Sequence, residues 1–309
     1  MRAQSKAKMT AIVHVHTAIG DVTVDLSCPV SLALELDFAA IAQGDHRTSG
    51  LDTARKPSQP RHFDAPAATS RPYSVPGFSG SVATGASCNC DVVTVIPHCN
   101  GTHTECVGHL TREPFDAYRL VPTGLTEALL LTVAPVAAAL EPGESTEPAP
   151  HTDDRLVTRR ALETAWASHA DAANARPPVL VLRTRHEAAP ASDAAAPARA
   201  DATAVPPPAY LTREAALLLV EWGIEHLVID LPSIDREHDE GRLTAHRIFF
   251  GLPANSRELA QATRPQATVT EFAAIPNDLE DGAYLLAIHA PAWRGDAVPS
   301  RPLLYPFQQ

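Results

Sequence analysis

The sequence predicts a mixed α/β fold. Expected strands outnumber expected helices along the 309 residues. Some of these strands are apolar throughout, as in parallel sheets covered on both faces, and others alternate apolar and polar residues, as in strands with one solvated face. No internal repeat and no Pro/Gly-rich linker divides the chain. We therefore expect one domain, residues 1–309, built on a single mixed sheet with flanking helices.

The N-terminal part predicts a hairpin followed by a loop. Residues 10–27 alternate apolar and polar positions on both sides of a Gly-Asp pair, which is typical of two strands joined by a turn. His14 and His16 share one face of the first strand, which we expect to be solvated. Residues 44–62 are polar and predict a loop.

A β-branched strand is expected next, over residues 90–97, and it leads directly into a segment rich in histidine. Cys88 and Cys90 lie two residues apart at its start. They lack the Cys-x-x-Cys spacing of a zinc knuckle, so we expect small buried core residues there.

The remaining elements alternate between strands and helices. Helical spacing of apolar residues predicts a helix within 153–170, and Thr212 is expected to cap a second helix that Gly223 ends. The expected strands are 129–136, 178–184, 224–233 and 283–291. Residues 186–209 are rich in Ala and Pro without periodicity, and predict a low-complexity insertion in the domain.

Composition narrows the class of partner. The net charge of −11 argues against nucleic acid, because proteins that bind it need a basic surface. No apolar run reaches the roughly 18–20 residues of a membrane span, and the N-terminus lacks the apolar core of a signal peptide. Five cysteines without such a signal favour free thiols in a reducing compartment. We expect a cytoplasmic protein that acts on a small molecule.

Residues 98–110, HCNGTHTECVGHL, gather three histidines, a glutamate and two cysteines. The spacings between His98, His103, Glu105 and His109 do not fit one helical face, and Gly101 disfavours a helix. Residues 103 and 105 share a face if extended, and a turn at the glycine could fold His98 back toward them. This pattern favours a loop wrapped around a zinc or manganese ion.

Two other interpretations remain open from spacing alone. The segment could be a polar loop whose histidines are unrelated. Cys99 and Cys106 could take part in a structural zinc knot, although we expect them to be packing residues.

The motif resembles the signature of the cyclase-like metal hydrolases, His-x-Gly-Thr-His-x-Asp-x-x-x-His, a family that includes bacterial kynurenine formamidase and isatin hydrolase. Gly101, Thr102, His103 and His109 fall on the pattern directly. His98 matches the leading histidine with one extra residue after it. Glu105 stands in the place of the aspartate.

The resemblance continues downstream. Residues 223–246 are similar to the family's Asp-x-x-Ser-x-Asp…His segment, and His246 then corresponds to a metal-site histidine. Arg247 stands where many members have a second histidine. Residues 268–305 resemble the closing stretch, and Glu271 matches the carboxylate that completes the site. Asp230, Ser233 and Asp235 either support the site or form a turn.

The resemblance implies the swivelling β/β/α fold and hydrolysis of an amide-type C–N bond, in a formamide or a cyclic amide, by an arylformamidase-like enzyme. It implies one or two divalent ions, zinc before manganese, and a homodimer or homotetramer. The implied ligands are His98, His103, Glu105, His246 and Glu271. His109 is assigned as the general acid/base, because an imidazole titrates near neutrality.

Other functions fit the same residues. A metal-dependent lyase, dehydratase or lactonase would use the same ion to polarise a carbonyl. A relative that only binds a metal or small ligand is also consistent with Glu105, Arg247 and the extra residue after His98.

Overall fold

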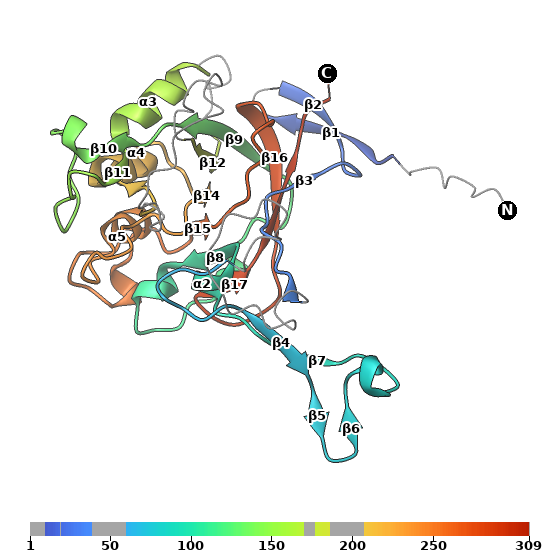
Figure 1. Cartoon of the computed structure of the whole chain (residues 1–309). Coiled ribbons are helices and arrows are strands. Elements are labelled where there is room, and N and C mark those ends of the chain that lie inside the picture. Colours follow the sequence, from blue (N-terminus) through green and yellow to red (C-terminus); the bar gives the residue numbers. More distant parts are fainter. Residues whose placement is uncertain (1–9, 19, 39–59, 170–176, 186–206, 309) are drawn as a thin grey trace, which may run out of the picture.

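A nine-stranded mixed sheet forms the centre of the molecule in the computed structural model, which describes residues 10–18, 20–38, 60–169, 177–185 and 207–308 (Figure 1). In spatial order the strands are β17 (Ala297–Pro299), β8 (His103–Cys106), β15 (Thr268–Glu271), β14 (His226–Ile229), β12 (Val179–Thr184), β9 (Thr126–Val133), β16 (Gly282–His289), β18 (Arg301–Tyr305) and β3 (Val30–Ser31).

Parallel pairing is confined to the middle of the sheet. β15, β14, β12 and β9 run parallel to one another, and β8, β17, β16, β18 and β3 add to the two sides by antiparallel pairing. The central strand β12 is buried at five of its six positions, as expected for a parallel strand covered on both faces. The predicted mixed α/β class is confirmed.

Three helices cover one face of the sheet: α3 (Arg159–Ala167), α4 (Arg213–Glu221) and α5 (Thr244–Phe250) (Figure 1). The side chains of Thr158 and Thr212 accept hydrogen bonds from the third residue of α3 and α4, so each helix begins at a threonine cap. Thr212 was predicted in this role. The helix expected within 153–170 is shorter, because its first residues form the strand β11 (Arg155–Val157).

The opposite face of the sheet packs against the N-terminal segment. Leu32 is completely buried there among side chains of β9, β12 and β16. The predicted hairpin is present as β1 (Ile12–Thr17) and β2 (Gly20–Asp25). Val24 packs it on Leu285 of β16 and Leu303 of β18, whose side chains lie on the other face of the sheet from those around Leu32. His14 and His16 are exposed, as expected.

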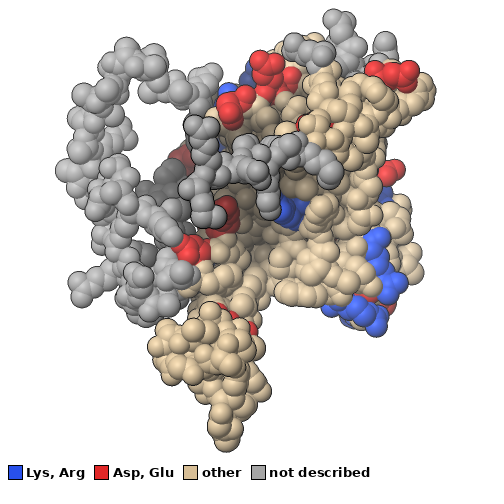
Figure 2. All heavy atoms as spheres, turned by 90° about the vertical axis from the view of Figure 1, so that its right-hand side faces the viewer, with Lys and Arg blue, Asp and Glu red and all other residues tan. Residues whose placement is uncertain are grey.

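Residues 69–94 form an arm that projects from the body (Figures 1 and 2). Its strands are β4 (Thr69–Pro72), β5 (Ser74–Val75), β6 (Phe78–Ser79) and β7 (Asp91–Thr94), with the 3-10 turn η1 (Val82–Thr84). The predicted burial of Cys88 and Cys90 is wrong, because both are exposed. Within the described part of the chain, the arm consists of two-stranded ladders with no layer packed on them, so it has no interior in which to bury a thiol.

Short elements complete the described chain. They are β10 (Val136–Ala137) and β13 (Tyr210–Leu211), which flank β11, the one-turn helix α2 (Pro97–Asn100), and the 3-10 turns η2 (Val107–Leu110), η3 (Ala117–Arg119), η4 (Ala138–Leu140) and η6 (Leu259–Gln261). Most of the predicted loop 44–62 and of the predicted insertion 186–209 lies outside the described residues. Within the described chain, no helix is long and apolar enough to cross a membrane.

Candidate metal centre

The histidine-rich segment is regular structure, not the loop that we predicted. His98 lies in α2, and His103 and Glu105 lie on β8. The prediction was wrong because β8 takes its neighbours, β15 and β17, from the last 45 residues of the chain. The four residues of β8 are fully enclosed by that pairing.

Strand register brings two of the predicted ligands together. His103 is the direct partner of Glu271 across the antiparallel β8–β15 pair, and opposite residues of such a pair face each other. Glu105 lies two residues beyond His103 and therefore shares its face. On the other face of the pair, hydroxyl groups form hydrogen bonds between the strands: Thr104 Oγ1 lies 2.7 Å from Thr270 Oγ1 and 2.8 Å from Ser300 Oγ.

Gly101 makes the turn between α2 and β8. Its φ of 151° lies in a range that side chains disfavour, and a Cβ there would be 3.2 Å from Leu36 Cδ2. The turn folds α2 back over the strand, so that His98 Nε2 lies 3.4 Å from Glu105 Oε2. The return of His98 toward the strand was expected from the sequence.

Four side chains form what we call the inner group: His103, Glu105, His246 and Glu271. Their exposed fractions are 0%, 1%, 2% and 3%. His246 Nε2 lies 2.7 Å from Glu105 Oε1 and 3.4 Å from Glu271 Oε1. His103 Nε2 lies 3.5 Å from Glu271 Oε2 and 3.9 Å from Glu105 Oε2.

Several polar atoms of the inner group lack hydrogen bonds. Among the described residues, Nε2 of His103, Nε2 of His246 and Oε1 of Glu105 are buried without a hydrogen-bond partner. Leaving such atoms unsatisfied costs about 1–3 kcal/mol each. Imidazole nitrogens and carboxylate oxygens that converge in this way are the donor set of a divalent-ion site, and the residues fit a zinc or manganese ion.

Both histidines of the inner group are oriented by acceptors on Nδ1. His103 Nδ1 lies 2.9 Å from the carbonyl of Gly101, and His246 Nδ1 lies 2.7 Å from Asp235 Oδ2. Asp235 also accepts hydrogen bonds from the backbone N–H groups of Ala245 and His246 at the start of α5. Because these oxygens only accept, each Nδ1 carries a proton, and in the neutral imidazole each Nε2 presents its lone pair to the centre.

Mutual charges dominate the titration of the inner group. Burial alone would raise the pKa of Glu105, but the positive charges of His109, His246 and His98 hold it well below its usual range. Burial alone would lower the pKa of His246, but the charge of Glu105 and the hydrogen bond to Asp235 raise it. The cluster therefore favours positive charge at its centre, which is what a bound cation supplies.

A second set, which we call the outer group, lies next to it and consists of His98, His109 and Asp296. Asp296 Oδ2 is 3.2 Å from His98 Nε2 and 3.3 Å from His109 Nδ1. These side chains are half-buried, with exposed fractions of 25%, 28% and 41%. The hydrogen bond from His109 and the charge of His98 hold the pKa of Asp296 below its usual range.

All six residues that the sequence assigned to the site converge on it. Glu271 does so although 25 residues separate it from His246. Asp296 was missed, because nothing in the sequence around it indicates a partner 187 residues earlier. Asp235 supports a histidine, which was one of the two roles considered for it.

The cysteines of the motif are packing residues. Cys99 and Cys106 are buried, as predicted, and neither belongs to the ligand groups found among the described residues. Burial raises the pKa of Cys106 to about 12, which keeps the thiol protonated. A zinc knot built on these two thiols is therefore disfavoured.

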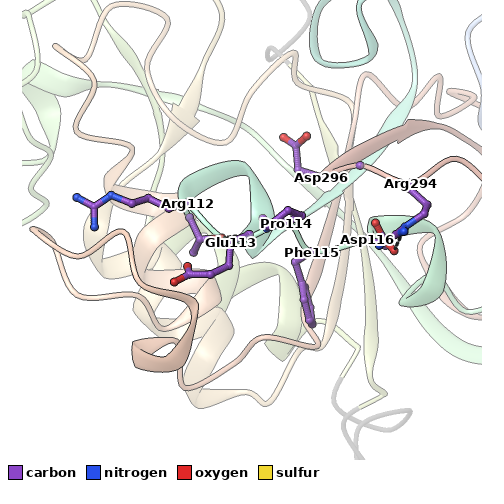
Figure 3. A pocket seen from close by; sticks show the side chains of 10 residues that line it. Arg112, Glu113, Pro114, Phe115, Asp116, Arg294 and Asp296 are labelled. Atoms are coloured by element: carbon purple, nitrogen blue, oxygen red, sulfur yellow. Dashed lines mark hydrogen bonds and ion pairs between the residues drawn. The ribbon is translucent and has the colours of Figure 1, made fainter.

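Two cavities flank the segment 108–112 beside the outer group. One, of about 370 Å³, is lined by charges of both signs, including Asp296 and the ion pair of Arg294 with Asp116 (Figure 3). The other, of about 130 Å³, is lined by His109, Arg112, Arg247 and Arg257. Arg247, which occupies a second-histidine position in the family resemblance, points to this cavity and not into the inner group.

A family model described as "Putative cyclase" matches residues 24–236, more than half of the chain. The chain belongs to the cyclase family. This confirms the resemblance found in the sequence. Among curated proteins, no sequence matches the chain.

The chain is also similar to solved structures at low sequence identity. "The Structure Of Potential Metal-Dependent Hydrolase With Cyclase Activity" is 12% identical, with a TM-score of 0.50, and the likeness covers 90% of this chain and 98% of that one. A predicted metal-dependent hydrolase from Bacillus stearothermophilus is 14% identical, with a TM-score of 0.49, over 90% and 98% of the two chains. Isatin hydrolase A from Labrenzia aggregata, bound to benzyl benzoate, is 14% identical, with a TM-score of 0.47, over 91% and 94%.

Proposed function

We propose that this cyclase-family protein is a metal-dependent hydrolase that cleaves an amide-type C–N bond in a formamide or a cyclic amide. The observation that carries the proposal is the inner group. Oε1 of Glu105 and Nε2 of His246 lie 2.7 Å apart without a hydrogen bond among the described residues. Two acceptors at that distance need a shared cation or proton to be stable.

His103, Glu105, His246 and Glu271 would hold the ion, and His98 would complete its ligands from the surface side. When bound, a divalent ion supplies a water of lowered pKa and polarises a carbonyl group. The two carboxylates compensate the charge of the ion, and Asp235 and Gly101 fix the ligand nitrogens. Because these side chains are buried and those of the outer group are half-buried, we propose that the substrate reaches the centre from the side of the outer group.

His109 is the proposed general acid/base. It is half-buried at the edge of the inner group, with its ring centroid 5.9 Å from that of His246. Asp296 receives the hydrogen bond of Nδ1, which leaves Nε2 free to take a proton from water and deliver it to a leaving nitrogen. The charge of Glu105 and the hydrogen bond to Asp296 outweigh burial and raise the pKa of His109 above its ordinary value.

The choice of a C–N bond rests on relatives. The motif 98–109 resembles that of family members that open formamides and cyclic amides, and the structural neighbours include a potential metal-dependent hydrolase and an isatin hydrolase. These similarities support amide hydrolysis as the reaction class and leave the individual substrate to experiment.

Elemental analysis tests the proposal first. Untagged protein purified without chelator should carry one or two equivalents of zinc or manganese, and a chelator should remove them without unfolding the protein. Loaded protein should then hydrolyse a member of a formamide and cyclic-amide panel, and chelated protein should not. Protein that binds no metal after reconstitution would contradict the proposal. Metal without turnover across the panel would favour a relative that only binds the ion.

A further inference from the structure

The smaller of the two cavities beside His109 carries an unusual set of charges. Three arginines line it, Arg112, Arg247 and Arg257, and none of its lining residues is acidic. The larger cavity on the other side of the segment 108–112 mixes both signs (Figure 3). The chain as a whole has a net charge of −11, whereas the charged side chains that line this cavity next to the proposed acid/base are positive.

The arginines differ in how their charge is compensated. Arg112 forms an ion pair with Glu258. Among the residues that the structure describes, the side chain of Arg247 forms hydrogen bonds only to backbone carbonyls, those of Arg242, Pro253 and Ser256 at 2.8–3.1 Å. The negative charge that acts on it comes from Asp235, which is already hydrogen-bonded to His246.

Arg257 is the least compensated of the three. Within the described chain, its side chain makes no ion pair and no hydrogen bond, and its positive charge acts on Arg247. Its backbone is held beside Arg112, because its carbonyl accepts a hydrogen bond of 2.9 Å from the backbone N–H of Arg112, and its side chain lines the cavity. Two guanidinium groups held close together without a carboxylate form a binding site for an anion.

The size of the cavity limits what it can hold. Its volume of about 130 Å³ is well below the roughly 300–1,000 Å³ of pockets that enclose a whole ligand. It therefore fits one substituent of a substrate whose reacting group lies at His109. A carboxylate suits this volume and matches the fork of donors on a guanidinium.

We propose that Arg247 and Arg257 form a carboxylate-binding subsite, and that the substrate is an amide that carries a carboxylate near its scissile C–N bond. This inference rests on the proposed function for the reaction, and on the arginines alone for the charge of the substrate. The subsite holds the anion at one end of the substrate and places the leaving nitrogen within reach of His109.

Binding of products tests the subsite independently of turnover. We choose 2-aminobenzoate and aniline, which would be released from 2-formamidobenzoate and formanilide and cannot be hydrolysed further. Calorimetry on the metal-loaded protein should show 2-aminobenzoate binding at least tenfold more tightly than aniline. Arg257→Gln should abolish most of that preference, Arg257→Lys should retain part of it, and aniline binding should not change.

Arg294→Gln is the matched control, because it removes the same charge from a neighbouring arginine that is paired with Asp116. It should keep the full preference. Arg247→Gln should act like Arg257→Gln, and circular dichroism should show whether its three lost backbone contacts disturb the fold. Equal binding of the two compounds by wild-type protein would overturn the subsite. So would a preference that survives in Arg257→Gln, since the carboxylate would then be bound by the ion.

Kinetics separate this inference from the proposed function. If the enzyme hydrolyses both formamides, kcat/KM should favour 2-formamidobenzoate in the wild type and lose about tenfold of that preference in Arg257→Gln. An arginine-dependent preference in binding without any hydrolysis would retain the subsite and reject the amide reaction. Hydrolysis with identical selectivity in both proteins would retain the reaction and reject the subsite.

Discussion

The inner and outer groups of the metal centre use the same residue types in different environments. His103, Glu105, His246 and Glu271 are almost completely enclosed, whereas His98, His109 and Asp296 keep a quarter or more of their side chains exposed. Burial makes an unfilled inner group costly and therefore suits an ion that stays. Exposure makes the outer group accessible to a substrate. The difference suggests a division of roles between two adjacent histidine–carboxylate clusters: the inner group would bind the ion, and the outer group would transfer protons to and from the substrate.

The comparison predicts its largest effect for the inner group. Replacing His103 by Ala should lower metal affinity by more than about 100-fold, because even residues that only orient a ligand cost 10–100-fold when they are replaced. Turnover should be lost with the metal, as measured by elemental analysis after dialysis. His289→Ala, at an exposed position, is the control. Full metal content in His103→Ala would remove His103 from the set of ligands.

His109→Ala should separate the two groups. Metal content should stay at the wild-type level, and kcat should fall by about 10²–10⁴-fold, the range typical of a lost general acid/base. Loss of metal in this variant would instead make the outer group a second ion site. Unchanged kcat on an identified substrate would show that the catalytic assignment of His109 is wrong.

Asp235→Asn tests whether the hydrogen bond between Asp235 and Nδ1 of His246 orients that histidine toward the ion. The amide can donate a hydrogen bond to Nδ1 of His246, which would move the imidazole proton to Nε2 and block the lone pair that faces the ion. We expect a 10–100-fold lower metal affinity, measured by competition with a chelator. Asp278→Asn, on an exposed loop, should change nothing. Equal affinities in both variants would assign Asp235 to the start of α5 alone.

Asp230 can be compared with Glu105 and Glu271, because it is a partly buried carboxylate whose pKa is not shifted by a histidine. Burial raises its pKa to about 6 from an ordinary 3.8, although hydrogen bonds from Thr184 oppose the shift. The folded state thus binds the proton of Asp230 more tightly than the unfolded state does. The contribution of Asp230 to the stability of the protein is therefore lost as pH rises from 4 through 6. Relative to Asp230→Asn, the wild-type free energy of unfolding should fall by about 2 kcal/mol between pH 4 and 7.

Urea denaturation at both pH values measures this difference, because protonation of all other groups cancels between the two proteins. A parallel pH dependence of wild type and Asp230→Asn would mean that Asp230 titrates normally. Glu105 and Glu271 are buried as deeply but have lowered pKa values, so histidine contacts and not burial decide the sign.

Local sequence signals predicted the local features of the fold. Apolar runs indicated β12 and β16, and Thr212 indicated the start of α4. The spacing of His103 and Glu105 indicated a shared face, which the strand β8 provides. Each of these features depends on residues within a few positions of one another, so the sequence carries the information directly.

Features that depend on distant partners could not be predicted in the same way. The pairing of β8 with β15 and β17 enclosed a segment that looked like a loop. Asp296 is separated from His109 by most of the chain, and the exposure of Cys88 follows from an arm that packs against nothing in the described chain. The cytoplasmic location and the homodimer or homotetramer stay predictions.

The antiparallel addition of β8 to strands from the end of the chain has a consequence for biosynthesis. His98 to His109 leave the ribosome about 160 residues before Thr268–Glu271 and about 190 residues before Ala297–Pro299, the strands that enclose them. During that interval the nascent chain displays three histidines and two thiols with no fixed geometry, and unfolded segments of this kind can capture metal ions unselectively. Correct metal loading must therefore follow completion of the chain, which makes insertion of the ion one of the last events in the maturation of this protein.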